Sequence, residues 1–183
     1  MIETERFILR PQIEADYEPL CAIWGDPAVT WYINGVPSTP EQTWHRLVRG
    51  AGMWALKGYG PFAILDKQSG QYLGDAGHAD YRRGLGPTFD PYPEAGWVLA
   101  SHAHGKGVAS EAVAAVHRWF DENRPETRSV CIISPENLAS LRVAEKVGYR
   151  PFGRMDYNGE VIMFERMRPT PQAPALDAAD APA

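Results

Sequence analysis

A short glycine-containing segment, residues 102–111 with the sequence HAHGKGVASE, constrains the fold of this chain more than any other feature. A strand is expected before it, over Glu94 to Leu99, and an amphipathic helix after it, over Ala109 to Asn123. Gly105 and Gly107 carry no Cβ, so a phosphate can approach the backbone at these positions. Backbone N–H groups and the helix dipole favour negative charge at such a junction. The segment therefore predicts a site for a phosphorylated cofactor.

A Gly-x-Gly pair by itself is also found in ordinary strand-to-helix turns, so the flanking blocks matter. The block before the loop has Glu94, Gly96 and Trp97. The loop block has Gly105, Lys106, Gly107, Ala109, Glu111 and Ala112. The last block has Asn137, Ser140, Glu145, Lys146, Gly148 and Tyr149. In this order and spacing the chain resembles the GNAT superfamily of acetyl-CoA-dependent N-acetyltransferases, in its RimJ/RimL-like branch. The resemblance covers residues 1–168 and includes the opening segment ERFILRP.

The remaining patterns agree with an α/β (α+β) architecture in which helices cover a sheet. Strands are expected at residues 7–10, 60–65, 72–81, 94–99, 130–133, 149–157 and 161–167. Helices are expected at residues 17–24, 40–57, 109–123 and 138–147. The resemblance implies a mixed, mostly antiparallel central sheet of about seven strands, splayed between the fourth and fifth strands and flanked by about four helices.

Capping residues mark the ends of several of these elements. Asp16 is expected to cap the first helix, and Thr39 with Gln42 to form a capping box at the second. The apolar face of the second helix is predicted to contain Trp44, Leu47, Val48, Ala51 and Ala55. His117 is expected on the polar face of the third helix. Asn158-Gly159 predicts a tight turn between the last two strands.

Composition points to one domain, residues 1–168, followed by a Pro/Ala-rich tail, residues 169–183, that is expected to be disordered. The net charge of −5 gives no reason to expect nucleic-acid or membrane-surface binding. Cys21 and Cys131 are expected to be buried free thiols. No signal-peptide pattern or bilayer-length apolar run occurs, so a cytoplasmic enzyme is expected.

The GNAT resemblance implies where acetyl-CoA binds. The backbone of the strand before the loop would pair with the pantetheine amides, and the N–H groups of His104 to Val108 would hold the pyrophosphate. His102 stands where the family commonly has Gln or Arg, and a neutral imidazole brings one donor and no charge. Lys106 faces either phosphate or solvent. The predicted cofactor-binding residues are Trp97, Val98, Leu99, His102, His104, Gly105, Lys106, Gly107, Val108, Ala109, Asn137 and Ser140.

Two residues are predicted to be catalytic. Glu94 opens the strand beside the cofactor and is the expected base, with a pKa that partial burial would raise; the alternative is a surface carboxylate at a strand end. Ser140 would lie near the sulfur and protonate the departing thiolate. Asn137 would hold a pantetheine amide or the substrate, although both Asn137 and Ser140 also make good helix caps.

Other polar and aromatic residues have weaker patterns. His102 and His104, with His78, could form a metal site, but no further ligands show a recognisable spacing, so no metal is expected. Loop residues Trp31, Tyr32, Asn34, Tyr81, Arg82 and Arg83 could form the wall of an acceptor pocket or pack their own loops.

The leading hypothesis is an N-acetyltransferase that moves acetyl from acetyl-CoA to a primary amine by direct transfer in a ternary complex, as a monomer or homodimer. The amine could belong to a protein N-terminus, an amino acid, a polyamine or an aminoglycoside. The alternative from another class is a non-catalytic acyl-CoA-binding sensor or interaction module. A binder of some other phosphorylated ligand is the third hypothesis.

Overall fold

The computed structural model describes residues 1–33 and 35–169, so the expected disorder of the tail falls almost wholly outside the described residues. Its strands are β1 (Ile2–Glu3), β2 (Phe7–Pro11), β3 (Pro61–Asp66), β4 (Tyr72–Ala79), β5 (Glu94–Leu99), β6 (Arg128–Ile133), β7 (Arg150–Asp156) and β8 (Glu160–Met167). The α-helices are α1 (Tyr17–Trp24), α2 (Pro27–Thr30), α3 (Pro40–Lys57), α4 (Val108–Asn123) and α5 (Leu138–Lys146). Two 3-10 turns, η1 (Glu14–Asp16) and η2 (Ser101–Ala103), precede α1 and α4.

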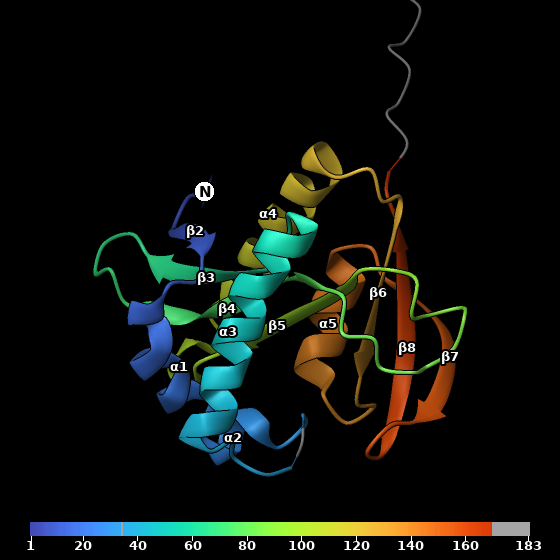
Figure 1. Ribbon diagram of the computed structural model, residues 1–183, viewed down its shortest axis with the longest axis horizontal. Helices are drawn as coiled ribbons and strands as arrows, with labels where there is room; N and C mark the ends of the chain where they lie inside the picture. The colour runs from blue at the N-terminus through green and yellow to red at the C-terminus, as the bar shows by residue number, and fades with distance from the viewer. Residues whose placement is uncertain (34, 170–183) are drawn as a thin grey trace, which may run out of the picture.

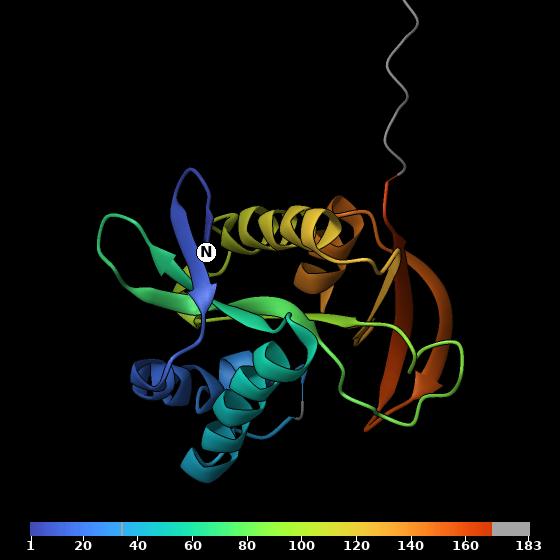
Figure 2. The same cartoon turned by 45° about the horizontal axis from the view of Figure 1, so that its top comes forward.

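These elements build one eight-stranded sheet in the order β1-β2-β3-β4-β5-β6-β8-β7 (Figure 1). The mixed, mostly antiparallel sheet is therefore confirmed, with one strand and one helix more than expected. The additions are β1, of two residues, and α2, of four residues, and such short elements leave no periodic pattern in a sequence. Helices α1, α2 and α3 cover one face of the sheet, and α4 and α5 cover the other (Figure 2).

The sheet opens between β5 and β6. Strands β4 and β5 are paired from Gly74 and Leu99 to Ala79 and Glu94. The parallel strands β5 and β6 are in register only at Glu94 and Val130, and diverge beyond that point. The expected splay between the fourth and fifth predicted strands is confirmed. It creates a gap in the middle of the sheet that side chains from both faces can line.

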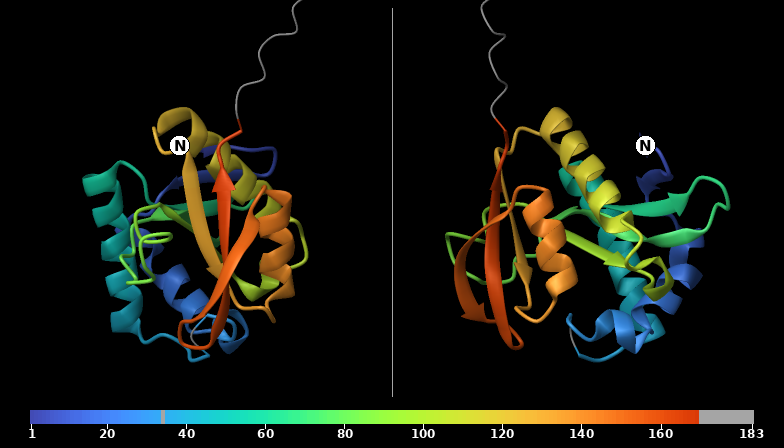
Figure 3. Two further views of the ribbon diagram at one scale, coloured as in Figure 1. Left: turned by 90° about the vertical axis from the view of Figure 1, so that its right-hand side faces the viewer. Right: turned by 180° about the vertical axis from the view of Figure 1, so that it is seen from behind.

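The pleat decides which β5 side chains face which helical layer, because successive side chains alternate between the two faces of a sheet. Val98 packs with the α1 and α3 core, whereas Trp97 packs with the α4 and α5 cores. Glu94 and Gly96 share the face of Val98. Figure 3 shows α4 and α5 lying together on the other face.

Several local predictions are confirmed. Thr39 Oγ1 accepts from the N–H of Gln42, and Gln42 Oε1 accepts from the N–H of Thr39, which completes the capping box of α3. The α5 helix ends before Gly148, which has a φ of +94°, and the N–H of Tyr149 donates back to the carbonyl of Ala144. The β7–β8 turn has positive φ at Asn158 and Gly159, as the Asn-Gly pair predicts.

Three local predictions are wrong. Asp16 stands at the N-cap position of α1, but its side chain makes no cap hydrogen bond there; its carboxylate accepts from the N–H of Ile13, the residue before η1, and pairs with Arg10. On α3, Leu47 is buried as expected, but Trp44 and Val48 are 40% and 51% exposed, and the other buried residues are Thr43 and Gly50. The core-facing side of α3 is therefore rotated from the predicted one, and part of the predicted apolar face is exposed.

The third error concerns α4, where His117 is buried rather than on the polar face. Its ring lies against those of His78 and Tyr149, with centroids 4.9 Å and 5.4 Å away. Polar residue type is a poor guide to exposure for histidine, which is often part of a core when neutral. Cys131 is a buried free thiol as expected, and Cys21 is free but only half-buried.

Candidate active site

A cavity of about 1030 Å³ occupies the opening between β5 and β6. Residues of β5, β6, α5 and the start of α4 line one part of it. Residues of β4, α3 and the loops after α2 and β4 line the other part. The volume is at the upper end of the range for small-molecule sites. It reaches both faces of the sheet, so two ligands can meet in the gap.

At the α4 end, the loop presents backbone donors to the cavity. Gly105 and Gly107 have φ of +73° and +75°, and Gly107 is the N-cap of α4. A Cβ built on Gly105 would meet no atom within 4 Å, so open space lies over this residue. In the described structure the N–H groups of residues 105–108 form no backbone hydrogen bond. Bare donors at a helix N-terminus suit a phosphate group.

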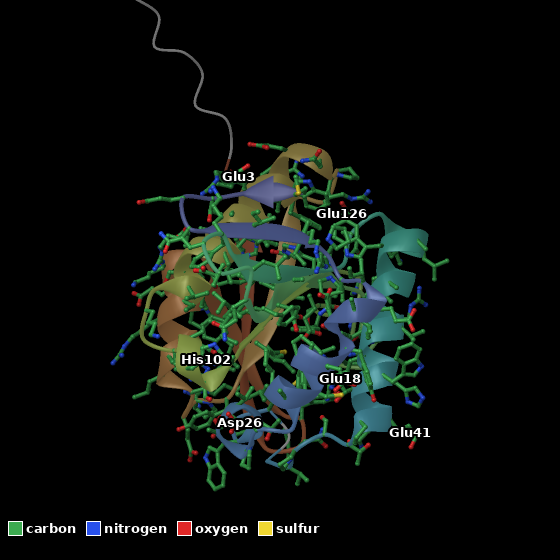
Figure 4. All side chains as sticks on the ribbon, turned by 90° about the vertical axis from the view of Figure 1, so that its left-hand side faces the viewer. Glu3, Glu18, Asp26, Glu41, His102 and Glu126 are labelled. Carbon is green, nitrogen blue, oxygen red and sulfur yellow. The ribbon has the colours of Figure 1, made fainter. Side chains whose placement is uncertain are left out.

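Most of the predicted cofactor-binding residues around this loop line the cavity, and two of them do not. Trp97, Val98, Leu99, His104, Gly105, Gly107, Val108 and Ala109 line the cavity. The side chains of His102 and Lys106 are exposed and lie outside the cavity lining; Figure 4 shows His102 on the turn after β5. His104 departs from expectation in one respect, because its N–H donates to the carbonyl of Ser101. The bare N–H groups therefore begin at Gly105.

Asn137 and Ser140 lie together at the start of α5, and both line the cavity. Asn137 is the N-cap of α5, and its Oδ1 accepts from the N–H of Ser140 at 3.1 Å. Its side-chain NH₂ donates to no described protein atom. Ser140 Oγ accepts from Trp97 Nε1 at 3.3 Å, so the hydroxyl proton is free to point into the cavity. Capping and ligand binding are compatible here, because they use different atoms.

Glu94 lies at the other end of β5 and is only 5% exposed. Its two carboxylate oxygens accept from Nε and Nη2 of Arg83, at 2.6 Å and 2.8 Å. Burial raises the pKa of Glu94, and the hydrogen bonds and charge of Arg83 oppose that rise. Arg83 also donates to Tyr157 Oη at 3.0 Å, which ties the loop after β4 to the β7–β8 hairpin. Glu94 is therefore a buried ion-pair member and not a surface carboxylate.

Asp75, in β4, is a second carboxylate in the cavity. It lies directly opposite Val98 in the antiparallel register, on the same face as Glu94. Its carboxylate forms no hydrogen bond or ion pair with a described residue. Burial raises the pKa of Asp75 to about 7, although the charges of Arg46 and Arg49 lower it. A carboxyl group with this pKa can take or give a proton near neutral pH.

Two arginines of α3 complete this half of the cavity. The Arg46 guanidinium lies 3.7 Å from the ring centroid of Trp24, and that of Arg49 lies 4.9 Å from the ring centroid of Tyr81. Both line the cavity. Burial, and then the positive charge of Arg49, lowers the pKa of Arg46. The two guanidinium groups therefore share one region of the cavity wall.

The predicted loop residues fall into three groups. Tyr32, Tyr81, Arg82 and Arg83 line the cavity. Trp31 is exposed and outside the lining, and Asn34 lies outside the described residues. The sequence prediction missed Asp75, Arg46 and Arg49. Asp75 had a usable signal, since it is the one carboxylate in the mostly buried strand YLGDAGHA, and a charge inside a buried strand is unusual.

His78 does not join His102 and His104. It is buried in the core, where its ring stacks on that of Phe120 at a centroid distance of 3.9 Å. Among the described residues, no three His, Cys, Asp or Glu side chains are grouped as a metal site would require. None of the described helices combines the length and apolar character needed to cross a bilayer.

Comparison with known protein families identifies the family to which this chain belongs. The family model described as "Acetyltransferase (GNAT) domain" matches residues 6–150, which include β5, the loop and α5. The chain belongs to the GNAT acetyltransferase family. Membership agrees with the splayed sheet and with the bare N–H groups that precede α4 in this GNAT chain.

Two similar proteins cover almost the whole chain. A structure described as a GnaT-family acetyltransferase from Bordetella pertussis is 34% identical, with a TM-score of 0.80, over 90% of this chain and 98% of that one. An uncharacterized N-acetyltransferase, p20, of Bacillus licheniformis is 28% identical over 90% of this chain and 94% of its own length. This GNAT protein is therefore an N-acetyltransferase by family.

Two more distant structures share the fold. One is AAC(6')-Ib in complex with paromomycin and acetyl-CoA, 19% identical with a TM-score of 0.72 over 90% of this chain and 94% of that one. The other is RimL, a ribosomal alpha-N-protein acetyltransferase, in complex with coenzyme A, 17% identical with a TM-score of 0.73 over 90% and 96%. At these identities RimL is a distant neighbour, so the expected RimJ/RimL-like branch stays a prediction.

Proposed function

We propose that this protein transfers an acetyl group from acetyl-CoA to a primary amine by direct transfer in a ternary complex. One observation carries the proposal. A single cavity joins the bare N–H groups of residues 105–108 to the carboxylates of Asp75 and Glu94, and passes through the opening between β5 and β6. A phosphorylated donor can enter from the α4 side and an amine from the α3 side. Their reacting atoms would then meet in the gap.

The donor side would hold acetyl-CoA through the backbone. The pyrophosphate would accept from the N–H groups that begin at Gly105. The pantetheine amides would pair with the part of β5 that β6 leaves open, at Trp97 to Leu99. The side-chain NH₂ of Asn137 would donate to a pantetheine carbonyl. The side chains of His102 and Lys106 are exposed and lie outside the cavity lining, so they would add little to binding.

The transfer itself requires three actions from the protein. A backbone N–H near Val98 would polarise the thioester carbonyl. The neutral amine nitrogen would bond to the acetyl carbon while the carbon–sulfur bond breaks. Ser140 Oγ would give its proton to the departing thiolate and take one back from the newly bonded nitrogen. A carboxylate on the acceptor side would take the proton that the ammonium must lose.

Two carboxylates are candidates for the base that takes the proton from the acceptor ammonium. Glu94 is the base that the sequence motif predicts, and Arg83 engages both of its oxygens. It is four residues from Val98, about 13 Å along the strand, so its proton transfer would pass through water. Asp75 lies directly opposite Val98, and its carboxylate is open to the cavity. The geometry favours Asp75 as the direct proton acceptor, and the variants described in the Discussion decide between them.

The first test is calorimetric titration with acetyl-CoA, coenzyme A and ATP. Micromolar binding of acetyl-CoA with no binding of ATP is expected. Coenzyme A release is then measured with amine acceptors, for the natural chain and for Ser140→Ala. The variant is expected to keep its affinity for acetyl-CoA and to lose turnover by about 10²-fold. Tight acetyl-CoA binding without acetylation of any amine would instead establish the sensor hypothesis.

A further inference from the structure

The acceptor half of the cavity carries more positive charge than its carboxylates balance. Four guanidinium groups line it, those of Arg46, Arg49, Arg82 and Arg83, against the carboxylates of Asp75 and Glu94. Arg82 is paired with Asp80. Arg83 and Glu94 neutralise each other through their two hydrogen bonds. Asp75 is the remaining carboxylate in this half, and the charge of Arg49 acts on it. With its pKa at about 7, it is only partly ionised at neutral pH.

Arg49 carries a positive charge in this half of the cavity for which the described residues show no ion-pair partner. In the described structure it lies over the ring of Tyr81 and forms no ion pair with a carboxylate. Its charge nevertheless lowers the pKa of both Asp75 and Glu94, which places it close to both. A guanidinium stacked on an aromatic ring is held in orientation while its N–H donors stay available. Those donors point to a ligand group that accepts two hydrogen bonds.

The position of Arg49 excludes the cofactor pyrophosphate as its natural partner. The Tyr81 hydroxyl lies 3.8 Å from a Cβ built on Gly96, so the Arg49–Tyr81 pair lies over the first half of β5. The bare N–H groups follow the other end of that strand, which spans about 17 Å. They also lie at the N-terminus of α4, and α4 covers the opposite face of the sheet from α3, the helix that carries Arg49. An anion at Arg49 therefore belongs to the acceptor.

We propose that the acceptor of this enzyme is an amine that carries its own anionic group, a carboxylate or a phosphate, which Arg49 binds while the amine faces Asp75. A free amino acid, a short acidic peptide or an aminoalkyl phosphate has this chemistry. Polyamines and aminoglycosides do not, because their further charges are positive and the arginines of α3 would repel them. This inference rests on the proposed transferase function and narrows its substrate class.

The test compares acceptors in matched pairs. Coenzyme A release is measured for amino acids and for their carboxamides, which keep the amine and lose the anion. Phosphoethanolamine, spermidine and paromomycin complete the panel. The anionic member of each pair is expected to have a kcat/KM at least about tenfold higher, which corresponds to about 1.4 kcal/mol. Phosphoethanolamine separates a preference for phosphate from one for carboxylate.

Arg49→Gln supplies the second arm, with Arg118→Gln as its matched control, because Arg118 is exposed on α4. Arg49→Gln is expected to raise KM for anionic acceptors by about tenfold and to leave the carboxamides and the acetyl-CoA affinity within about twofold. Arg118→Gln is expected to change neither. A preference for spermidine or paromomycin, or an equal effect of Arg49→Gln on both members of a pair, would overturn the proposal.

A last measurement keeps this proposal separate from the proposed function. If acetyl-CoA binds and no amine in the panel reacts, N-acetyl amino acids and N-acetylspermidine are titrated into the protein with coenzyme A present. Binding of the anionic products that weakens in Arg49→Gln supports the proposal; binding of N-acetylspermidine alone, or of none, refutes it. Failure of acetyl-CoA itself to bind refutes the transferase function and the acceptor class with it.

Discussion

Arg83 binds both carboxylate oxygens of Glu94, at 2.6 Å and 2.8 Å, and so joins the loop after β4 to the start of β5. Replacing it by glutamine leaves a nearly buried carboxylate without its counter-charge. We expect Arg83→Gln to lower the free energy of unfolding by about 3 kcal/mol in urea denaturation at pH 7. Adding Glu94→Gln should restore most of the loss, since the uncompensated charge is then removed. If Arg83→Gln alone is as stable as the natural chain, the ion pair does not contribute to stability.

The role of Asp75 predicts a specific pH dependence. A base must be deprotonated, so kcat/KM should fall as pH drops through about 7, the pKa of this carboxyl group. Asp75→Asn should lower kcat by about 10²-fold or more and remove that inflection. Glu94→Gln should keep the inflection. The opposite assignment, with the inflection lost only in Glu94→Gln, would make Glu94 the base. An acceptor amine of low pKa separates the enzyme's titration from that of the substrate.

Asp75 should also change the free energy of unfolding, and the direction of the change depends on pH. Its folded-state pKa of about 7 is above its ordinary value of 3.8, so folding disfavours the ionised form. The unfavourable contribution of Asp75 therefore grows as pH rises from about 4 and is complete above about 7. Asp75→Asn should consequently be more stable than the natural chain at pH 8 and not at pH 4.

Gly105 provides a test of the phosphate site with a close control. Gly105→Ala places a Cβ in the open space over the bare N–H groups, at a φ of +73°. We expect acetyl-CoA affinity to fall by about tenfold or more in calorimetry, because the phosphate can no longer approach the backbone. Gly84→Ala imposes similar strain, at a φ of +76° and with nothing within 4 Å of its Cβ, in the loop after β4. An equal loss of affinity in both variants would mean that strain alone is responsible.

The buried histidines of the core should make the fold acid-sensitive. Burial lowers the pKa of His117 from 6.5 to about 3, so the unfolded state binds the extra proton between these values. Its contribution to stability is complete above about pH 6.5 and is lost toward pH 3, at about 1.4 kcal/mol per pH unit. His117→Leu should flatten the dependence of urea midpoint on pH from 7 to 4. His45→Leu, at an exposed position of α3, should not.

Predictions from sequence succeeded where a few neighbouring residues determine the structure. The capping box of Thr39 and Gln42, the Asn158-Gly159 turn and the αL position of Gly148 each depend on one to four residues and their backbone preferences. The loop at Gly105 and Gly107 belongs to the same class. Its bare N–H groups follow from the glycine conformations and the start of α4, whatever the rest of the chain does.

Errors arose where rotation or burial of an element depended on its neighbours. Part of the predicted apolar face of α3 is exposed, because packing decides which side of the helix is buried. Gly50 lies against Pro61, with a Cβ placed there only 2.8 Å from the proline ring, so the helix approaches β3 on that side. Trp44 is left half-exposed, and its ring packs edge-on against Tyr17. His117 is buried because the sheet places His78 and Tyr149 beside it.

The sequence alone determined the order of the elements, the glycine loop before α4 and the family to which both belong, because these features are encoded in short contiguous blocks. Only the tertiary structure brought Asp75, Arg49 and Glu94 into one cavity. They come from β4, α3 and β5, and their meeting depends on strand register, on the pleat that puts Asp75 and Glu94 on one face, and on the rotation of α3. Those relations are set by packing between distant segments, which no local pattern records.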